Sequence, residues 1–255
     1  MGEARKTKLD MNQSVYTNRI ALTVALGGFL MGFDASVISG VNKFVQIQFN
    51  LSDLQLGFSV SSLTIVAALA MMFSGPLSDK YGRKLVLKYC ALIFTVSAIG
   101  SALATGFTSF LIFRMLGGLG VGASLIVAPM YIAEIAPASK RGRLVSFNQL
   151  NIVLGITIAF FTNYYILSLA DHTSSWVSNY GIAEHNWRWM LGIEALPAIV
   201  YFFALFSVPK SPRWLMSKGN ENKATAVLQR FISVEETAEE IKAIKAALNN
   251  VNSSR

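Results

Sequence analysis

Six long apolar stretches constrain the fold of this sequence more than any other feature. Short polar connections such as Ser78–Lys84 and Pro137–Arg143 separate them. A helix needs roughly 20 apolar residues to cross the hydrocarbon core of a bilayer, and in lipid its backbone groups must satisfy one another. We therefore predict an all-α integral membrane protein, a bundle of six transmembrane helices. The expected spans are Ile20–Val41, Leu56–Leu77, Leu85–Thr105, Phe110–Ala133, Val145–Leu169 and Trp189–Val208.

The charge content supports a membrane protein. Only 14% of the residues are charged, against about one quarter in a soluble domain. The first apolar run is too long for the core of a cleaved signal peptide. The net charge of +8 is therefore expected to face anionic membrane lipid rather than nucleic acid.

Lysine and arginine fall mainly on one side of the predicted bundle. The opposite set of connections carries only Lys43 and Arg188. Because cytoplasmic loops are enriched in basic residues, we predict a multi-pass protein of the cell membrane with both termini in the cytoplasm. The basic residues assigned to the cytoplasmic side are Arg5, Lys6, Lys8, Arg19, Lys80, Arg83, Lys84, Lys88, Lys140, Arg141, Arg143, Lys210, Arg213 and Lys218.

The pattern divides the chain into three parts: a cytoplasmic N-terminal segment (1–19), the transmembrane bundle (20–208) and a cytoplasmic helical segment (209–255). In the last part, Glu221–Asn250 is charged but carries apolar residues at helical spacing, which predicts amphipathic helices. Those apolar residues are Ala224, Val227, Leu228, Phe231, Ile241, Ile244 and Leu248.

Apart from Lys88, which is assigned to the cytoplasmic side, three charged residues lie inside the predicted spans: Asp34, Arg114 and Glu194. With a rise of about 1.5 Å per residue, each lies roughly 21–22 Å from the inner edge of its span, so all three reach one depth. Buried charge in a bilayer is costly and marks ion or substrate pathways. Two interpretations stay open, a static ion pair that fixes helix packing and a group linked to proton transfer or gating.

Enzymatic chemistry has little support in this sequence. No nucleophile–base pair or metal motif stands out, and His172 and His185 share one polar loop. Gly75–Lys84 does not meet the spacing of a phosphate-binding loop. We expect no enzyme activity, no cofactor and no metal site.

Several motifs occur in the order found in one family. The motifs are Gly32–Gly40, Gly75–Lys84, Arg114–Gly122, Pro129–Pro137, Arg141-Gly142, Trp187–Met190 and Ser211–Leu215. Together they make the chain similar to the N-terminal half of a sugar porter of the major facilitator superfamily, and most similar to bacterial xylose–proton symporters. The resemblance implies half of that superfamily's fold, built from two inverted three-helix repeats, and a sugar and a proton as partners.

The resemblance also implies roles for single residues. Asp34 would be the protonatable residue, with Arg114 and Glu194 as its partners. Gln149 would contact sugar hydroxyls, and an amide both donates to and accepts from a hydroxyl. The alternative for Gln149 is a hydrogen bond that joins two helices.

The remaining family residues belong to the cytoplasmic side. Gly75 is expected to allow close helix approach, and Asp79 to cap the following helix. Asp79 and Arg83 would act in gating, and Glu134, Arg141 and Arg143 are expected to join them in one salt-bridge cluster.

Three positions depart from the family pattern. Met31 replaces an aromatic residue and Ile156 a second glutamine, which leaves the identity of the sugar open. Lys210 replaces an acidic residue next to the expected salt-bridge cluster.

Whole transporters of this kind bind substrate between two six-helix halves. This chain is therefore expected to supply the N-terminal half of a sugar transporter, as a fragment, as part of a split transporter with a C-terminal partner, or as a dimer. The alternative is a six-helix remnant with an interaction or regulatory role and no transport of its own.

Overall fold

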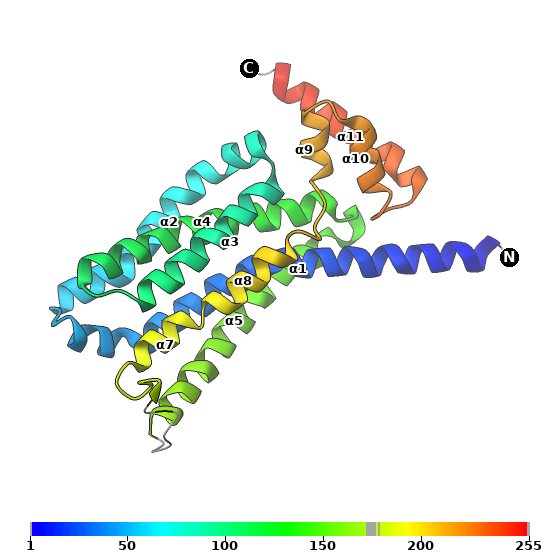
Figure 1. Ribbon diagram of the computed structural model, residues 1–255. Helices are drawn as coiled ribbons and strands as arrows, with labels where there is room; N and C mark the ends of the chain where they lie inside the picture. Colours follow the sequence, from blue (N-terminus) through cyan, green and yellow to red (C-terminus); the bar gives the residue numbers. More distant parts are fainter. Residues whose placement is uncertain (1, 172–176, 178, 254–255) are drawn as a thin grey trace.

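The computed structural model describes residues 2–171, 177 and 179–253, and all regular elements among these residues are helices. The membrane bundle lies beside a smaller helical segment at the C-terminus (Figure 1). The elements are α1 (Gly2–Gln48), α2 (Asp53–Tyr81), α3 (Arg83–Ala102), α4 (Phe107–Ile135), η1 (Ala138–Lys140), α5 (Arg141–Ala170), α7 (Asn186–Gly192), α8 (Ala195–Ala204), α9 (Pro212–Ser217), α10 (Glu221–Leu228) and α11 (Val234–Ser253).

Five of the described helices are long and apolar enough to cross a membrane: α1, α2, α3, α4 and α5. Four of them extend beyond both ends of the predicted spans, whereas α3 begins before its predicted span but ends at Ala102, short of Thr105. The helix α1 continues without a break through the predicted N-terminal segment. The connection expected over Ser78–Lys84 is wrong, because α2 ends at Tyr81 and α3 begins at Arg83. Gly82 alone joins them, with a φ of +94° that favours glycine.

The sequence analysis predicted one continuous helix for the sixth apolar run, and this prediction is wrong. The run forms α7 followed by α8. Pro197 has no N–H to donate to the carbonyl of Ile193, four residues earlier. The N–H of Leu196 bonds to that carbonyl instead, at 3.1 Å, and the N–H of Glu194 bonds to Leu191 at 3.2 Å. These tighter turns interrupt the α-helix at Glu194, the one charged residue of the run.

Glycines bring two pairs of helices into backbone contact. A Cβ on Gly32 of α1 would lie 2.0 Å from the carbonyl oxygen of Ile152 in α5, and one on Gly122 of α4 would lie 2.2 Å from that of Ala67 in α2. The first helix of each three-helix segment thus packs against the second helix of the other segment. This exchange is the arrangement expected of two inverted repeats, and it confirms the predicted fold class.

Both described ends of the chain lie at the same end of the bundle (Figure 1). There the C-terminal segment docks on α1 at Gln13 and Tyr16, three to four turns after the helix begins. The Gln13 amide donates to the carbonyl of Ile232 at 2.8 Å, and the rings of Tyr16 and Phe231 are 5.2 Å apart. The predicted amphipathic pattern is confirmed, since Ala224, Leu228, Phe231, Ile241 and Ile244 are buried.

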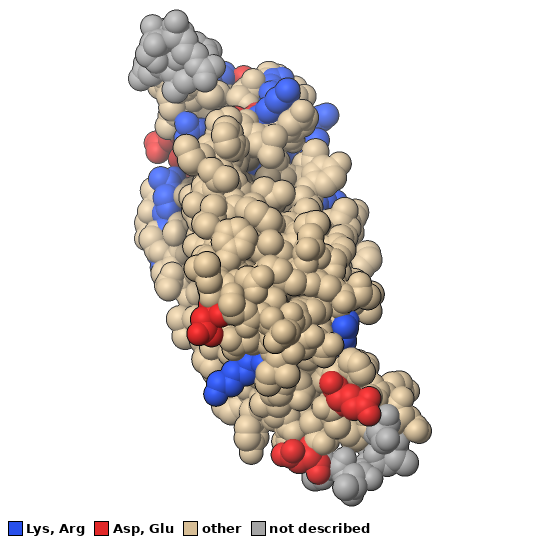
Figure 2. Space-filling view, turned by 90° about the vertical axis from the view of Figure 1, so that its left-hand side faces the viewer, with Lys and Arg blue, Asp and Glu red and all other residues tan. Residues whose placement is uncertain are grey.

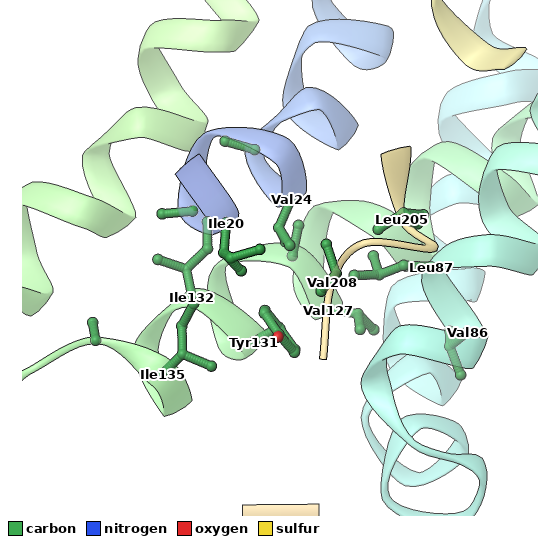
Figure 3. Close-up of a cluster of buried hydrophobic side chains, with 14 of the residues drawn as sticks. Ile20, Val24, Val86, Leu87, Val127, Tyr131, Ile132, Ile135, Leu205 and Val208 are labelled. Carbon is green, nitrogen blue, oxygen red and sulfur yellow. The ribbon is translucent and has the colours of Figure 1, made fainter. Parts of the chain in front are cut away.

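The apolar core continues from the bundle toward this segment. Figure 3 shows Ile20 and Val24 of α1 facing Tyr131 and Ile132 of α4, with Leu205 close by. The hydroxyl of Tyr131 donates to the carbonyl of Pro209 at 2.9 Å. This bond ties the end of the sixth run to the core.

The outer surface is apolar over its middle. Figure 2 shows a face on which uncharged residues cover most of the centre, while charged side chains lie mainly toward the two ends. Exposed large apolar side chains are frequent on α2 and α5, among them Phe73 and Phe161, each 69% exposed. Such a surface fits a surrounding of lipid or of a further membrane domain.

Candidate functional site

The charged residues of α1 and α4 form a buried ion pair at the centre of the bundle. Both terminal nitrogens of Arg114 donate to the carboxylate of Asp34, the Nη2–Oδ2 pair at 3.2 Å. Asp34 is 3% exposed and Arg114 is 2% exposed. A bidentate pair of this kind fixes the orientation of both side chains.

Glu194 approaches this pair from the turn between α7 and α8. Its side chain is 2% exposed and interacts electrostatically with both Asp34 and Arg114. Its Oε1 has no hydrogen-bond partner within the part of the chain described here. The structure thus brings together all three charges that the depth argument had placed at one level, which we call the intramembrane charge cluster.

Gln149 lies apart from this cluster, on the exposed face of α5. The residue before it, Asn148, is buried against α1, where its backbone and side chain face Gly28. An exposed amide does not bond two helices of this chain to each other. Gln149 is therefore free to meet a molecule or a domain that lies against α5.

At the end of the bundle near α9, Arg83 is surrounded by oxygen atoms. Its Nη2 lies 2.6 Å from Asp79 and 2.9 Å from Glu134, and its Nη1 donates to the carbonyl of Ser78 at 3.3 Å. The side chain of Asp79 is 68% exposed, whereas that of Glu134 is 8% exposed. We call Asp79, Arg83, Glu134 and Ser211 the Arg83 cluster.

Ser211 is a member of this cluster that the sequence analysis did not assign. Its hydroxyl donates to the carboxylate of Glu134 and accepts the N–H of Trp214 at 3.2 Å. It is the N-cap residue of α9, followed by Pro212 at the first position of the helix. Serine before proline is a helix-start signal that could have located it.

Three expectations about this region are wrong. Asp79 does not cap α3, because it lies inside α2 and pairs with Arg83 instead, while Gly82 occupies the N-cap position. Gly75 does not allow close approach within this chain, since a Cβ there would meet nothing within 4 Å. Arg141 does not join the Arg83 cluster, because its charge lies 4.0 Å from Glu240 of α11.

The comparison with known proteins agrees with this architecture. The family model described as "Sugar (and other) transporter" matches residues 20–255. The chain belongs to this sugar transporter family. Its six-helix arrangement is that of half a fold of the major facilitator superfamily.

Two bacterial members of the sugar transporter family show the extent of the similarity. The glucose transport protein of Synechocystis is 43% identical over 209 residues, covering 82% of this chain and 44% of the relative. The D-xylose–proton symporter of Escherichia coli K12 is 36% identical over 263 residues, covering 93% of this chain and 52% of the relative. The chain thus spans about half the length of the curated relatives it matches.

Solved structures of the family match the fold closely. The proton:xylose symporter XylE bound to 6-bromo-6-deoxy-D-glucose superimposes with a TM-score of 0.84 at 35% identity, covering 93% of this chain and 54% of that protein. The inward-open form of the xylose transporter from E. coli gives a TM-score of 0.78 at 34% identity, covering 90% and 55%. These relatives are membrane transporters.

Proposed function

We propose that this chain supplies the N-terminal half of a transporter that moves a monosaccharide, such as xylose or glucose, together with a proton. The observation that carries the proposal is the intramembrane charge cluster. It joins the first helices of both repeats to the interrupted sixth run, and its charges are removed from water. Burying such charges is costly, so they mark a pathway more often than a structural contact.

Protonation of Asp34 is the proposed coupling step. When the carboxylate takes a proton, Arg114 loses the charge that holds it through both terminal nitrogens. The guanidinium then has Glu194 as its remaining anionic neighbour, and α1, α4 and the α7–α8 turn are no longer held in one arrangement. Loss of the proton restores the pair, so proton binding favours one arrangement of the bundle over the other.

Gln149 is the proposed sugar contact. Its position on the exposed face of α5 allows its amide to bond a sugar hydroxyl in a site shared with a second six-helix half. A site of this kind explains why an uncharged polar group stands on a face that is otherwise rich in large apolar residues.

The Arg83 cluster is the proposed gate on the cytoplasmic side. Asp79 is exposed at the surface while Glu134 is buried, so Arg83 has one partner that a moving domain can reach and one that it cannot. Gly75, on the same helix as Asp79, has open space beside it for that domain. Arg141, which faces Glu240, would link the gate to the movement of α11.

The proposal includes the surroundings of the chain. It would lie in the cell membrane with both termini in the cytoplasm, in contact with lipid and with a C-terminal transporter half. It would carry out no enzymatic reaction and bind no nucleic acid.

Counterflow of labelled xylose and glucose in proteoliposomes tests the proposal. The chain is reconstituted alone and together with the C-terminal half of the E. coli symporter, and that symporter's own two halves expressed separately are the positive control. We expect exchange in the second sample, its loss in Gln149→Ala, and a loss of its pH dependence in Asp34→Asn. The proposal would be overturned if the control exchanged sugar but neither sample did, which would favour a remnant without transport.

A further inference from the structure

An apolar groove and a basic cleft adjoin each other on the surface of α2, α3 and α4. The groove has a volume of about 770 Å³ and is lined by residues such as Phe73, Tyr89 and Leu119. The cleft has a volume of about 290 Å³ and lies toward α9. Tyr81 and Leu85 line both, so the two cavities are neighbours along one path.

The cleft gathers positive charge that nothing in the described chain neutralises. Lys84, Lys88 and Lys210 all line it, and Lys88 and Lys210 are close enough to repel Lys84 electrostatically. None of the three has a carboxylate within 4.0 Å among the described residues. We call them the lysine triad.

Lys84 and Lys88 are half-buried and contact Phe206, whereas Lys210 is exposed beside Trp214. Lys84 donates to the carbonyl of Phe206 at 3.1 Å, and the ammonium of Lys88 lies 3.1 Å from the ring centre of the same residue. The ammonium of Lys210 lies 5.1 Å from the ring of Trp214. Aromatic and basic groups combined in this way are typical of the membrane–water interface.

Unused hydrogen-bond donors occur beside the triad. Trp214 and Arg83 also line the cleft, and the buried Nε1 of Trp214 and Nε of Arg83 have no acceptor within the described residues. The Nη2 of Arg83 is paired with Asp79 and Glu134, and its Nη1 donates to the carbonyl of Ser78. The cleft thus holds cations and donors but lacks an anion.

We propose that the groove and the cleft together bind one anionic phospholipid, with an acyl chain in the groove and the headgroup phosphate at the lysine triad. The groove supplies an apolar surface at the depth of the acyl chains, and the triad supplies charge complementary to the phosphate. Lys210 is central to the argument because an acidic residue there would give the cleft its own counter-ion. The site is separate from the intramembrane charge cluster and from Gln149, so its test does not depend on transport.

The test is native mass spectrometry of the purified chain with equimolar phosphatidylglycerol and phosphatidylcholine of identical acyl chains. We expect the chain to retain phosphatidylglycerol in preference. A basic residue near the membrane surface contributes a factor of about five, so Lys210→Gln lowers the preference about fivefold and Lys210→Glu lowers it further. Lys223→Gln removes the same charge from an exposed position of α10 that does not line the cleft, and it leaves the preference unchanged.

Two more samples separate a lipid from a soluble anion and test the groove. Leu119→Trp fills the groove without touching the triad, and it lowers retention of phosphatidylglycerol. Glycerol phosphate, which carries the same phosphate without acyl chains, competes only weakly. The proposal is overturned if both lipids are retained equally, if Lys223→Gln acts like Lys210→Gln, if Leu119→Trp retains phosphatidylglycerol as the wild type does, or if glycerol phosphate displaces the lipid at equal concentration.

Discussion

Arg114 of α4 meets Asp34 of α1 through both terminal nitrogens, and both side chains are almost fully removed from water. The two residues belong to the first helices of the two three-helix repeats, so a single ion pair joins equivalent helices of the two repeats. Removing one partner of a buried pair is more harmful than replacing both, because it leaves an uncompensated charge.

The two partners are therefore expected to tolerate substitution differently. Arg114→Met leaves both Asp34 and Glu194 without a cation and lowers the free energy of unfolding by about 3–5 kcal/mol. Asp34→Asn leaves Arg114 beside Glu194, so its cost is smaller. Thermal unfolding of the purified variants in detergent measures both. Equal losses in the two variants would contradict a role for Glu194 as the second anion.

The glycine contacts predict that the same substitution, glycine to alanine, changes stability differently at two positions. Gly32→Ala places a Cβ 2.0 Å from a backbone oxygen of α5, and backbone cannot yield as a flexible side chain does. We expect a loss of about 1–3 kcal/mol from overpacking. Gly57→Ala in α2, where a Cβ meets nothing within 4 Å, is the matched control and is neutral or slightly stabilising because alanine favours the helix. Equal melting temperatures for the two variants would show that α1 and α5 separate without cost.

Most of the fold could be predicted because apolar length and charge position act locally along the chain. Hydrocarbon thickness sets the length that an apolar run needs to span the membrane, and the depth of Asp34, Arg114 and Glu194 follows from helix rise alone. The interruption at Glu194 was missed although Pro197 indicates it, because hydropathy does not register a missing N–H.

The partners within the Arg83 cluster were less predictable. Which carboxylate meets Arg83, and whether Arg141 faces Glu134 or Glu240, depends on how α3, α4 and α11 pack across the chain. No local pattern contains this information. The surroundings of Gly75 could not be predicted for the same reason. The pattern Gly75–Lys84 identifies the family, but it does not show that the space beside the glycine is open.

The interruption of the sixth run predicts an effect of Pro197→Ala. Alanine restores an N–H that can bond to the carbonyl of Ile193 and join α7 to α8 in one helix. We expect slower amide hydrogen exchange around Glu194 and a displaced Glu194 side chain. Pro212→Ala is the control, because a proline at the first turn of a helix has no intrahelical bond to restore. Unchanged exchange in Pro197→Ala would mean that packing, not the proline, interrupts the helix.

The unequal exposure of the two acids around Arg83 leads to the last prediction. Glu134→Gln removes a buried anion 2.9 Å from Arg83 and weakens the acceptor for the hydroxyl of Ser211, so we expect a loss of about 3 kcal/mol in unfolding free energy. Asp79→Asn removes an anion whose side chain is 68% exposed, and water screens that pair, so the loss is at most about 1 kcal/mol. Thermal unfolding of the chain in detergent decides between them. A larger loss for Asp79→Asn would show that the exposed carboxylate, rather than Glu134, holds the buried guanidinium in place.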